Sequence, residues 1–254
     1  MSDHRLIPDW DVPAAVRALT TTRSGGCSTG PYASLNLGNH VGDADPSVAD
    51  NRRSLRRGPG ALPADPLWLQ QVHGTQVIAA EDYRPDAEAD ACIARTPGLV
   101  CAVLTADCLP LLFCAEDGSV VGVAHAGWRG LSAGVIEACV AAMAIPPAGL
   151  RAWLGPAIGP RVYQVGDEVR QRFCEQHADA ELAFVPQQPG KWLCDLYLLA
   201  RQRLAALGVG RVSGGEHCTY SDPQRFYSYR RDGVTGRMAT CIWLDAGAGG
   251  AVPV

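Results

Sequence analysis

Apolar and polar residues follow one another in short blocks whose length and spacing predict both strands and helices. Apolar runs bounded by glycine, proline or charged residues are typical of strands, and they occur at 67–80, 98–105, 109–114, 119–127, 150–159, 225–233 and 236–245. Apolar residues at helical spacing predict helices at 46–57, 131–144, 166–177 and 194–209. Several neighbouring strands have no helix between them, so we expect an α+β fold with mixed β-sheets flanked by helices.

Helix- and strand-breaking residues do not divide the chain into parts. The strongest cluster of them, residues 56–66, fits a loop between a helix and a strand. Neither a G-x-G-x-x-G nor a G-x-x-x-x-G-K-[ST] phosphate loop is present. We therefore expect a single domain over residues 1–254, and not a doubly wound nucleotide-binding fold.

Composition narrows the classes of partner. The 254 residues are 47% hydrophobic and carry a net charge of −4, which gives no electrostatic reason to expect nucleic acid or a membrane as partner. The N-terminus lacks a secretory pattern, and the longest apolar stretch is interrupted by Asp107 and Pro110. We expect a cytoplasmic protein that acts on a small molecule. The sequence leaves its oligomeric state open.

Cysteine use fits the same picture. The ten cysteines form no C-x-x-C pair, and Cys101, Cys114, Cys139 and Cys241 stand in apolar contexts. We expect most of them to be buried thiols that pack as small hydrophobic groups.

Three residues with metal-binding side chains stand where apolar runs break. They are His73 in QQVHGTQV, Cys108 in LTADCLPLL and His125 in AHAGWRG. Two imidazoles and a thiolate form a three-ligand set for Zn²⁺ with a fourth position open, as in catalytic zinc sites. Such a metal lowers the pKa of bound water toward ~7. The separations match no compact zinc motif, so structural roles for the three residues remain the alternative.

The same residues allow a reaction without metal. Cys108 would then be a nucleophile and His125 its base, as in cysteine hydrolases. Asp107 would orient an imidazole, or it is simply a turn residue.

Two polar segments are candidates for binding a polar or anionic ligand. The glycine-rich segment 21–43 contains Arg23 and Asn36, and segment 227–237 concentrates Arg230, Arg231 and Arg237 near two tyrosines. A pair of turns and a solvated charged hairpin tip are the respective alternatives. Arg129, between Gly127 and Gly130, lies in a turn that could bind an anion at the start of a helix.

These motifs together resemble one family. Six segments of the chain are similar to segments of the YfiH-like family. They are TRSGGCSTGPYASLNLGNHVGD, WLQQVHGTQV, TPGLVCAVLTADCLPLLFC, AHAGWRGLSAGV, AWLGPAIGPRVYQVG and CTYSDPQRFYSYRRDGVTGRMATCIWL. This family is also called the laccase-domain or polyphenol-oxidase-like family, and some bacterial members are called peptidoglycan editing factor. The resemblance covers about residues 5–244 and leaves out the tail 246–254.

The resemblance implies both a fold and an activity. The fold would be a single α+β domain with mixed sheets, similar to cysteine hydrolases of the cytotoxic-necrotizing-factor type. The activity would be that of a zinc-dependent purine nucleoside enzyme, which phosphorolyses adenosine, inosine, guanosine and 5′-methylthioadenosine and deaminates adenosine. The family's metal triad maps onto His73, Cys108 and His125, which are also its catalytic residues.

The resemblance also guides the secondary assignments. For phosphate we favour Arg230 or Arg231 over Arg23 and Arg129, and we expect Asn36 to contact the base or sugar.

Three other functions stay open. The chain has six histidines and no His-x-His pair, so a multicopper laccase is excluded, although a single Cu²⁺ with weak polyphenol oxidation is not. A metal-free Cys-His hydrolase or amidase acting on peptidoglycan precursors is the second alternative. A binding module without enzymatic activity is the third.

Overall fold

The computed structural model describes residues 5–58 and 60–249. The outermost residues of the predicted domain, at 1–4 and 250–254, therefore lie outside the described residues, and so does most of the tail that the resemblance leaves out. No helix in the described part is long and apolar enough to cross a lipid bilayer.

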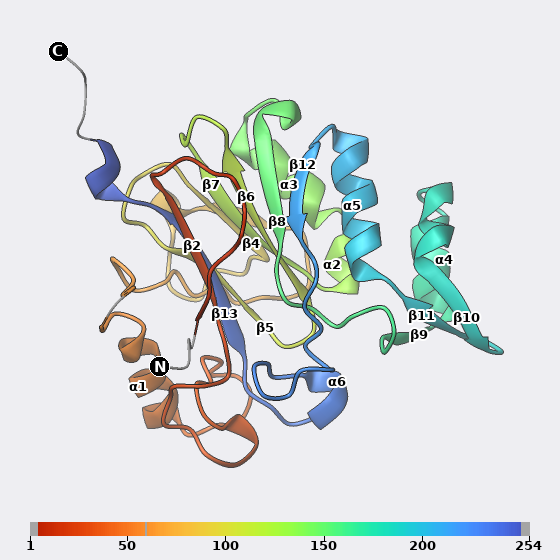
Figure 1. The fold of residues 1–254 in the computed structure, drawn as a ribbon, viewed down its shortest axis with the longest axis horizontal. Helices are drawn as coiled ribbons and strands as arrows, with labels where there is room; N and C mark the ends of the chain where they lie inside the picture. The colour runs from red at the N-terminus through yellow and green to blue at the C-terminus, as the bar shows by residue number, and fades with distance from the viewer. Residues whose placement is uncertain (1–4, 59, 250–254) are drawn as a thin grey trace.

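A mixed six-stranded sheet forms the centre of the molecule (Figure 1). Its strands, in spatial order, are β12 (Arg211–Gly214), β8 (Leu150–Leu154), β6 (Leu109–Ala115), β7 (Val121–Ala126), β4 (Ala91–Ala94) and β3 (Val77–Ala79). The two outer pairs are parallel and the inner pairs are antiparallel. The predicted α+β class with mixed sheets is confirmed.

An antiparallel four-stranded sheet packs on one face of this sheet. Its order is β1 (Arg5–Leu6), β2 (Val16–Thr21), β13 (Met238–Leu244) and β5 (Cys101–Thr105), so strands from both ends of the chain pair with each other. Leu112 and Cys114 of β6 share an apolar cluster with Val103 and Ile242 of the smaller sheet. This cluster holds the two sheets together.

Helices cover the opposite face of the six-stranded sheet. They are α2 (Trp128–Ala133), α3 (Val135–Met143) and α5 (Leu196–Leu207). Leu111 and Phe113 of β6 pack there, one residue out of step with the side chains that face the other sheet. This alternation is the two-residue period of a strand that is buried on both faces.

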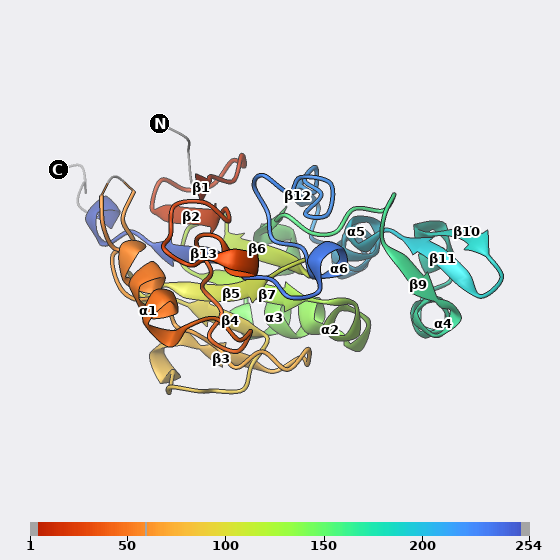
Figure 2. The ribbon, with the colours of Figure 1, turned by 90° about the horizontal axis from the view of Figure 1, so that it is seen from below.

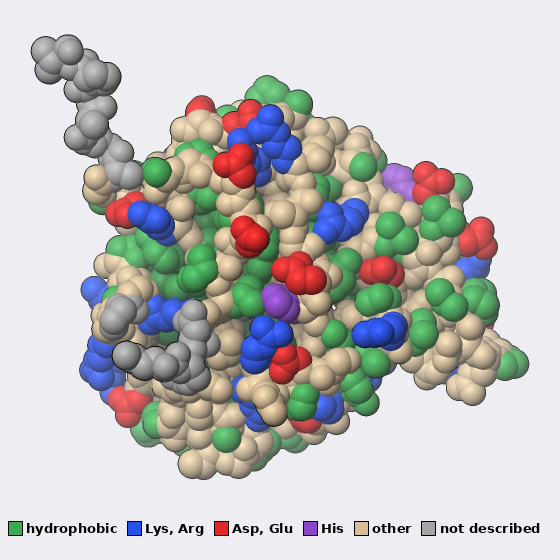
Figure 3. All heavy atoms as spheres, in the orientation of Figure 1, with side chains coloured by type: hydrophobic (Ala, Val, Ile, Leu, Met, Phe, Trp, Pro, Cys, Tyr) green, Lys and Arg blue, Asp and Glu red, His purple; other side chains and the backbone are tan. Residues whose placement is uncertain are grey.

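Two smaller units lie at opposite ends of the molecule (Figure 2). At one end is α1 (Asp45–Ser54), and at the other α4 (Asp167–Cys174) lies with the antiparallel sheet of β10 (Phe184–Gln188), β11 (Lys191–Cys194) and β9 (Gln164–Gly166). Acidic and basic side chains are interspersed over the face shown in Figure 3.

Most of the predicted elements are present. Strands β5, β6, β7, β8 and β13 and helices α1, α4 and α5 fall within the predicted ranges or within a residue of them. All ten cysteines are free, and the four that we singled out are buried. The sequence patterns did not reveal β2, β4, β10, β11 or β12.

Three predicted elements need correction. The predicted strand 67–80 is mostly irregular and contains only β3, while the predicted helix 131–144 is interrupted at Gly134, whose φ of 104° is not helical. The predicted strand 225–233 is instead a turn followed by the short helix α6 (Tyr229–Asp232). Its N-terminus is held by the Ser228 hydroxyl and by the Asp107 carboxylate, which accept the backbone N–H groups of Arg231 and Arg230.

Candidate metal centre and its pocket

The three residues predicted as metal ligands lie together. His73 comes from the loop before β3, Cys108 from the turn between β5 and β6, and His125 from β7. One potential ligand atom from each lies within 4.8 Å of the other two, and Cys108 Sγ is 3.8 Å from His73 Nε2. Ligand atoms bound to one tetrahedral zinc ion lie about 3.6 Å apart. The arrangement therefore fits a small metal ion.

Glycines allow helix α2 to begin against this cluster. A Cβ atom on Gly127 would lie 2.9 Å from both Cys108 Sγ and His73 Cδ2. A Cβ atom on Gly130 would lie 2.9 Å from the carbonyl oxygen of Gly74. Both contacts are closer than packed atoms allow. The two glycines in GWRG thus allow close packing around the triad. That this turn binds an anion stays a prediction.

Asp90 organises two of the three candidate ligands, and sequence reasoning missed it. Its fully buried carboxylate accepts the His125 Nδ1–H at 2.8 Å and the backbone N–H of His73 at 3.0 Å. It also accepts the backbone N–H groups of Val72 and Gly74. With Nδ1 engaged, Nε2 of His125 is the nitrogen left for a metal. The signal available in the sequence was an aspartate directly before the buried strand β4.

The charges in this cluster stabilise one another. Burial opposes ionisation of Cys108, but the two histidines outweigh it and lower the pKa of the thiol to about 6. Burial also opposes a charge on His125, yet the Cys108 thiolate and Asp90 raise its pKa to about 9. Burial likewise opposes the Asp90 carboxylate, whose pKa is nevertheless lowered by His125 and by backbone hydrogen bonds. A thiolate beside an imidazole can bind a metal and can also act as a nucleophile.

The triad opens into a pocket of about 540 Å³, within the usual size range of small-molecule sites. Aromatic side chains from three segments line it, and so do three arginines and, besides the triad, one further histidine. The aromatic residues are Trp128, Tyr163 and Tyr229, the arginines are Arg129, Arg230 and Arg237, and the histidine is His40.

The three arginines of the pocket form no salt bridge within the described residues. Arg129 stacks on Trp128 and Arg230 on Tyr163, with 4.6 and 5.1 Å from guanidinium carbon to ring centre. Within the described residues, none of the three pocket arginines has a carboxylate oxygen within 4 Å. An anionic ligand would complement this charge.

Asp107 is the carboxylate in the pocket wall, and it does not orient an imidazole, the role that the sequence had left open for it. Its oxygens accept the hydroxyls of Thr219 and Ser228 and the backbone N–H of Arg230. Its φ of 90° is a strained value for a residue other than glycine. Asp107 therefore fixes α6, and with it Arg230, beside Cys108.

The structure separates the secondary candidates into two groups. Arg129 and Arg230 line the pocket, whereas Arg23, Asn36 and Arg231 are not among its lining residues. Arg231 donates to the carbonyl oxygens of Thr219, Tyr220 and Phe226. It thus holds a turn together.

Arg23 and Asn36 also make internal contacts. The Arg23 guanidinium donates to the carbonyl oxygens of Ala33 and Pro223. Asn36 is fully buried, and its side-chain oxygen accepts the backbone N–H groups of Gly38 and Arg237. Asn36 thus supports the backbone of a pocket residue without lining the pocket.

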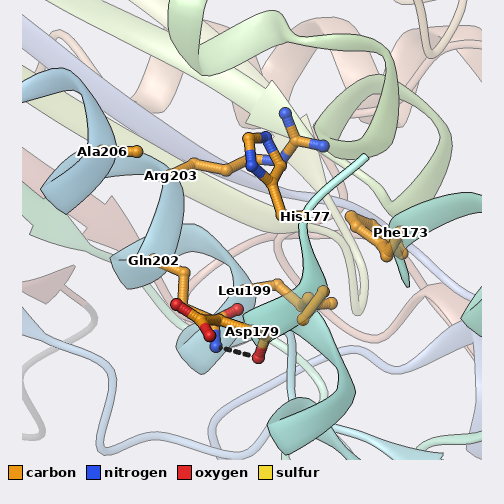
Figure 4. A pocket seen from close by; sticks show the side chains of 8 residues that line it. Phe173, His177, Asp179, Leu199, Gln202, Arg203 and Ala206 are labelled. Atoms are coloured by element: carbon orange, nitrogen blue, oxygen red, sulfur yellow. Dashed lines mark hydrogen bonds between the residues drawn. The ribbon is translucent and has the colours of Figure 1, made fainter. Parts of the chain in front are cut away.

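A second cavity, between α4 and α5, differs in chemistry (Figure 4). It measures about 80 Å³, room for little more than water. Its buried Arg203 pairs with Glu137 at 2.7 Å and donates to the Gln176 side-chain oxygen at 2.7 Å. The cation in this cavity is satisfied within the protein.

Comparison with known proteins places the chain in a family. The family model described as "Multi-copper polyphenol oxidoreductase laccase" matches residues 17–245, and the chain belongs to this family. Within residues 5–58 and 60–249, one group of three or more His, Cys, Asp or Glu side chains lies close enough together to hold a metal ion. It consists of His73, Cys108 and His125. This cluster could hold one metal ion, whereas the family description names several coppers.

Curated relatives and solved structures match nearly the whole chain. A purine nucleoside phosphorylase of Pseudomonas aeruginosa is 53% identical, and purine nucleoside phosphorylase YfiH of Escherichia coli is 52% identical, each over 94% of this chain and 98% of its own. The crystal structure of Neisseria meningitidis protein NMB0706 superposes with a TM-score of 0.92 at 48% identity, covering 96% of this chain and 100% of the other. The relatives thus support an enzymatic role.

Proposed function

We propose that this chain is a zinc-dependent purine nucleoside phosphorylase. The observation that carries the proposal is the open His-Cys-His cluster in a pocket that is also lined by aromatic side chains and by three arginines without a salt-bridge partner. The names of relatives at about half identity support the same activity.

The donor set favours zinc. Two imidazoles and one soft thiolate suit Zn²⁺, and three protein ligands are the number found at catalytic zinc sites. His73, Cys108 and His125 would hold the ion, and Asp90 would keep His125 in the required tautomer and orientation. When bound, the metal would supply a Lewis acid with one position open to substrate.

The remaining pocket residues suit the binding of two substrates, a purine nucleoside and phosphate. The rings of Trp128, Tyr163 and Tyr229 offer flat surfaces for a purine, and the arginines offer charge for phosphate. In the reaction a phosphate oxygen bonds to C1′ of the ribose, the C1′–N9 bond breaks, and the departing base takes up a proton. The products are the free base and ribose 1-phosphate.

Two further activities belong to this proposal. Deamination of adenosine and phosphorolysis of 5′-methylthioadenosine are implied by the resemblance and would use the same pocket. The cytoplasmic location stays a prediction.

Metal exchange combined with two substrates tests the proposal. The protein is stripped with a chelator, reloaded with Zn²⁺ or Cu²⁺, and assayed with inosine plus phosphate and with a phenolic substrate. We expect hypoxanthine and ribose 1-phosphate from the zinc form and no comparable phenol oxidation from either form. Phenol oxidation by the copper form, without nucleoside turnover by either, would establish the oxidase that the family description names.

A second candidate function rests on the Cys108–His73 distance of 3.8 Å and on the lowered pKa of the thiol. Both suit a metal-free cysteine hydrolase or amidase, including one that acts on peptidoglycan precursors. The two candidates differ after exhaustive chelation, because the hydrolase would keep full activity and the zinc enzyme would lose it.

A further inference from the structure

A hydroxyl group in the pocket wall lacks a partner. Thr105, the last residue of β5, is 2% exposed and lines the pocket, and its Oγ1 has no hydrogen-bond partner in the described part of the protein. Buried hydroxyls are nearly always hydrogen-bonded, and the exceptions often mark a place where a ligand or water binds. Thr105 therefore presents a donor to whatever occupies this side of the pocket.

Arg237 lines the same pocket as this hydroxyl. Thr105 pairs with Met238 in the register of β5 and β13, and Arg237 directly precedes Met238. One guanidinium nitrogen of Arg237 donates to the carbonyl oxygens of Thr235 and Gly236. No other hydrogen bond of this guanidinium to a described residue is present, which leaves donors for a ligand.

The surrounding residues fix Arg237 in this position. The buried Asn36 side-chain oxygen accepts its backbone N–H at 2.9 Å. A Cβ atom on Gly38 would lie 2.8 Å from Arg237 Cγ, so the absence of a side chain there makes room for the arginine. Burial lowers the pKa of Arg237, which means that the protein holds this cation where water stabilises it poorly. An anion at this point would restore that lost stabilisation.

We propose that Thr105 and Arg237 form the subsite for inorganic phosphate. The inference rests on the proposed phosphorolysis and names residues for its second substrate. The subsite differs from the arginines favoured from the sequence, because the Arg231 guanidinium binds carbonyl oxygens and Arg230 is exposed to solvent, whereas Arg237 is half-buried. A threonine hydroxyl and a guanidinium together suit the oxygens of one phosphate.

Three variants of the zinc-loaded enzyme test the subsite. Thr105→Val removes only the hydroxyl, and Arg237→Gln removes the charge. Thr235→Val is the matched control, because Thr235 is also 2% exposed with an unpartnered hydroxyl but is not among the pocket-lining residues. Phosphate binding is measured by calorimetric titration with inorganic phosphate, and KM is measured separately for phosphate and for inosine.

We expect Thr105→Val to weaken phosphate binding and raise its KM by about tenfold. Arg237→Gln should do so by roughly a hundredfold, and Thr235→Val should stay within about twofold of wild type. The KM for inosine should change little in any of them. Phosphate affinities within about twofold of wild type in both pocket variants would overturn the subsite, and so would a rise confined to the KM for inosine. If wild type bound phosphate through these residues but cleaved no nucleoside, the proposed function would fail and the subsite would stand.

Discussion

The small cavity between α4 and α5 and the large pocket both contain arginine side chains, but they differ in how the charge is paired. Between α4 and α5, Arg203 is paired with Glu137 and bonded to Gln176. In the large pocket, Arg129, Arg230 and Arg237 have no carboxylate partner among the described residues. A folded protein gains stability by pairing its buried charges. Arg237 is the half-buried arginine left unpaired beside the open pocket, and its missing partner is expected to be a ligand.

The comparison predicts which substitutions affect activity and which affect stability. The largest effect is expected at Cys108, because a serine hydroxyl is neither a soft metal ligand nor a comparable nucleophile. Cys108→Ser should reduce kcat/KM by at least about a thousandfold and lower the bound metal measured by elemental analysis. Cys174→Ser, a half-buried thiol outside the pocket, should behave like wild type. A Cys108→Ser protein with normal turnover would remove the triad from the reaction.

The second prediction concerns the paired cavity. Arg203→Gln leaves the half-buried Glu137 without its partner, so the free energy of unfolding should fall by about 2 kcal/mol. Denaturant unfolding measures this loss, while kcat/KM of the folded fraction should be unchanged. A large loss of activity at unchanged stability would mean that this cavity serves function. It would contradict the distinction between a paired arginine that stabilises the fold and unpaired arginines that bind a ligand.

The third prediction tests how the candidate ligands are held. Asp90→Asn replaces the carboxylate that accepts from His125 and His73, and it should weaken metal affinity by about 10- to 100-fold. Competition with a chromophoric chelator measures the affinity. Asp43→Asn, which alters a carboxylate bonded to Ser28 and Asn36 outside the pocket lining, is the control. Equal affinities in all three proteins would show that Asp90 does not orient the ligands.

The smallest effect is expected at Arg129, which like Arg230 is an exposed arginine of the pocket. Arg129→Gln should raise KM by roughly fivefold, because a solvated charge contributes little binding free energy. Its free energy of unfolding should stay within about 0.5 kcal/mol of wild type. This is the reverse of the pattern expected for Arg203→Gln. A stability loss as large as that of Arg203→Gln would mean that pocket arginines also serve the fold.

The parts of the fold that the sequence predicted are those dictated by local pattern. Continuous apolar runs predicted β5, β6 and β7, and the ends of such runs marked Cys108 and His125 as candidates. The family resemblance, and not the spacing, joined them with His73 into one triad. The strand predicted at 225–233 was wrong because α6 depends on Asp107, more than a hundred residues earlier in the chain. No local pattern could reveal that contact.

The same limit applies to the residues around the triad. Asp90 was missed because its partner His125 is distant in sequence. Arg230 and Arg231 are neighbouring residues of the same type. Arg230 lines the pocket, whereas Arg231 donates to the carbonyl oxygens of a turn. The sequence shows that an arginine is present, but it does not show whether backbone carbonyl oxygens already accept hydrogen bonds from its guanidinium group.

The most direct test of the account is the dependence of nucleoside cleavage on phosphate. Zinc-replete wild-type protein is incubated with adenosine, with and without inorganic phosphate, and adenine, inosine, hypoxanthine and ribose 1-phosphate are resolved by chromatography. The account predicts adenine and ribose 1-phosphate in equal amounts, formed only when phosphate is present, with any inosine formed in both conditions. Absence of all four products, or adenine release that is independent of phosphate, would contradict it.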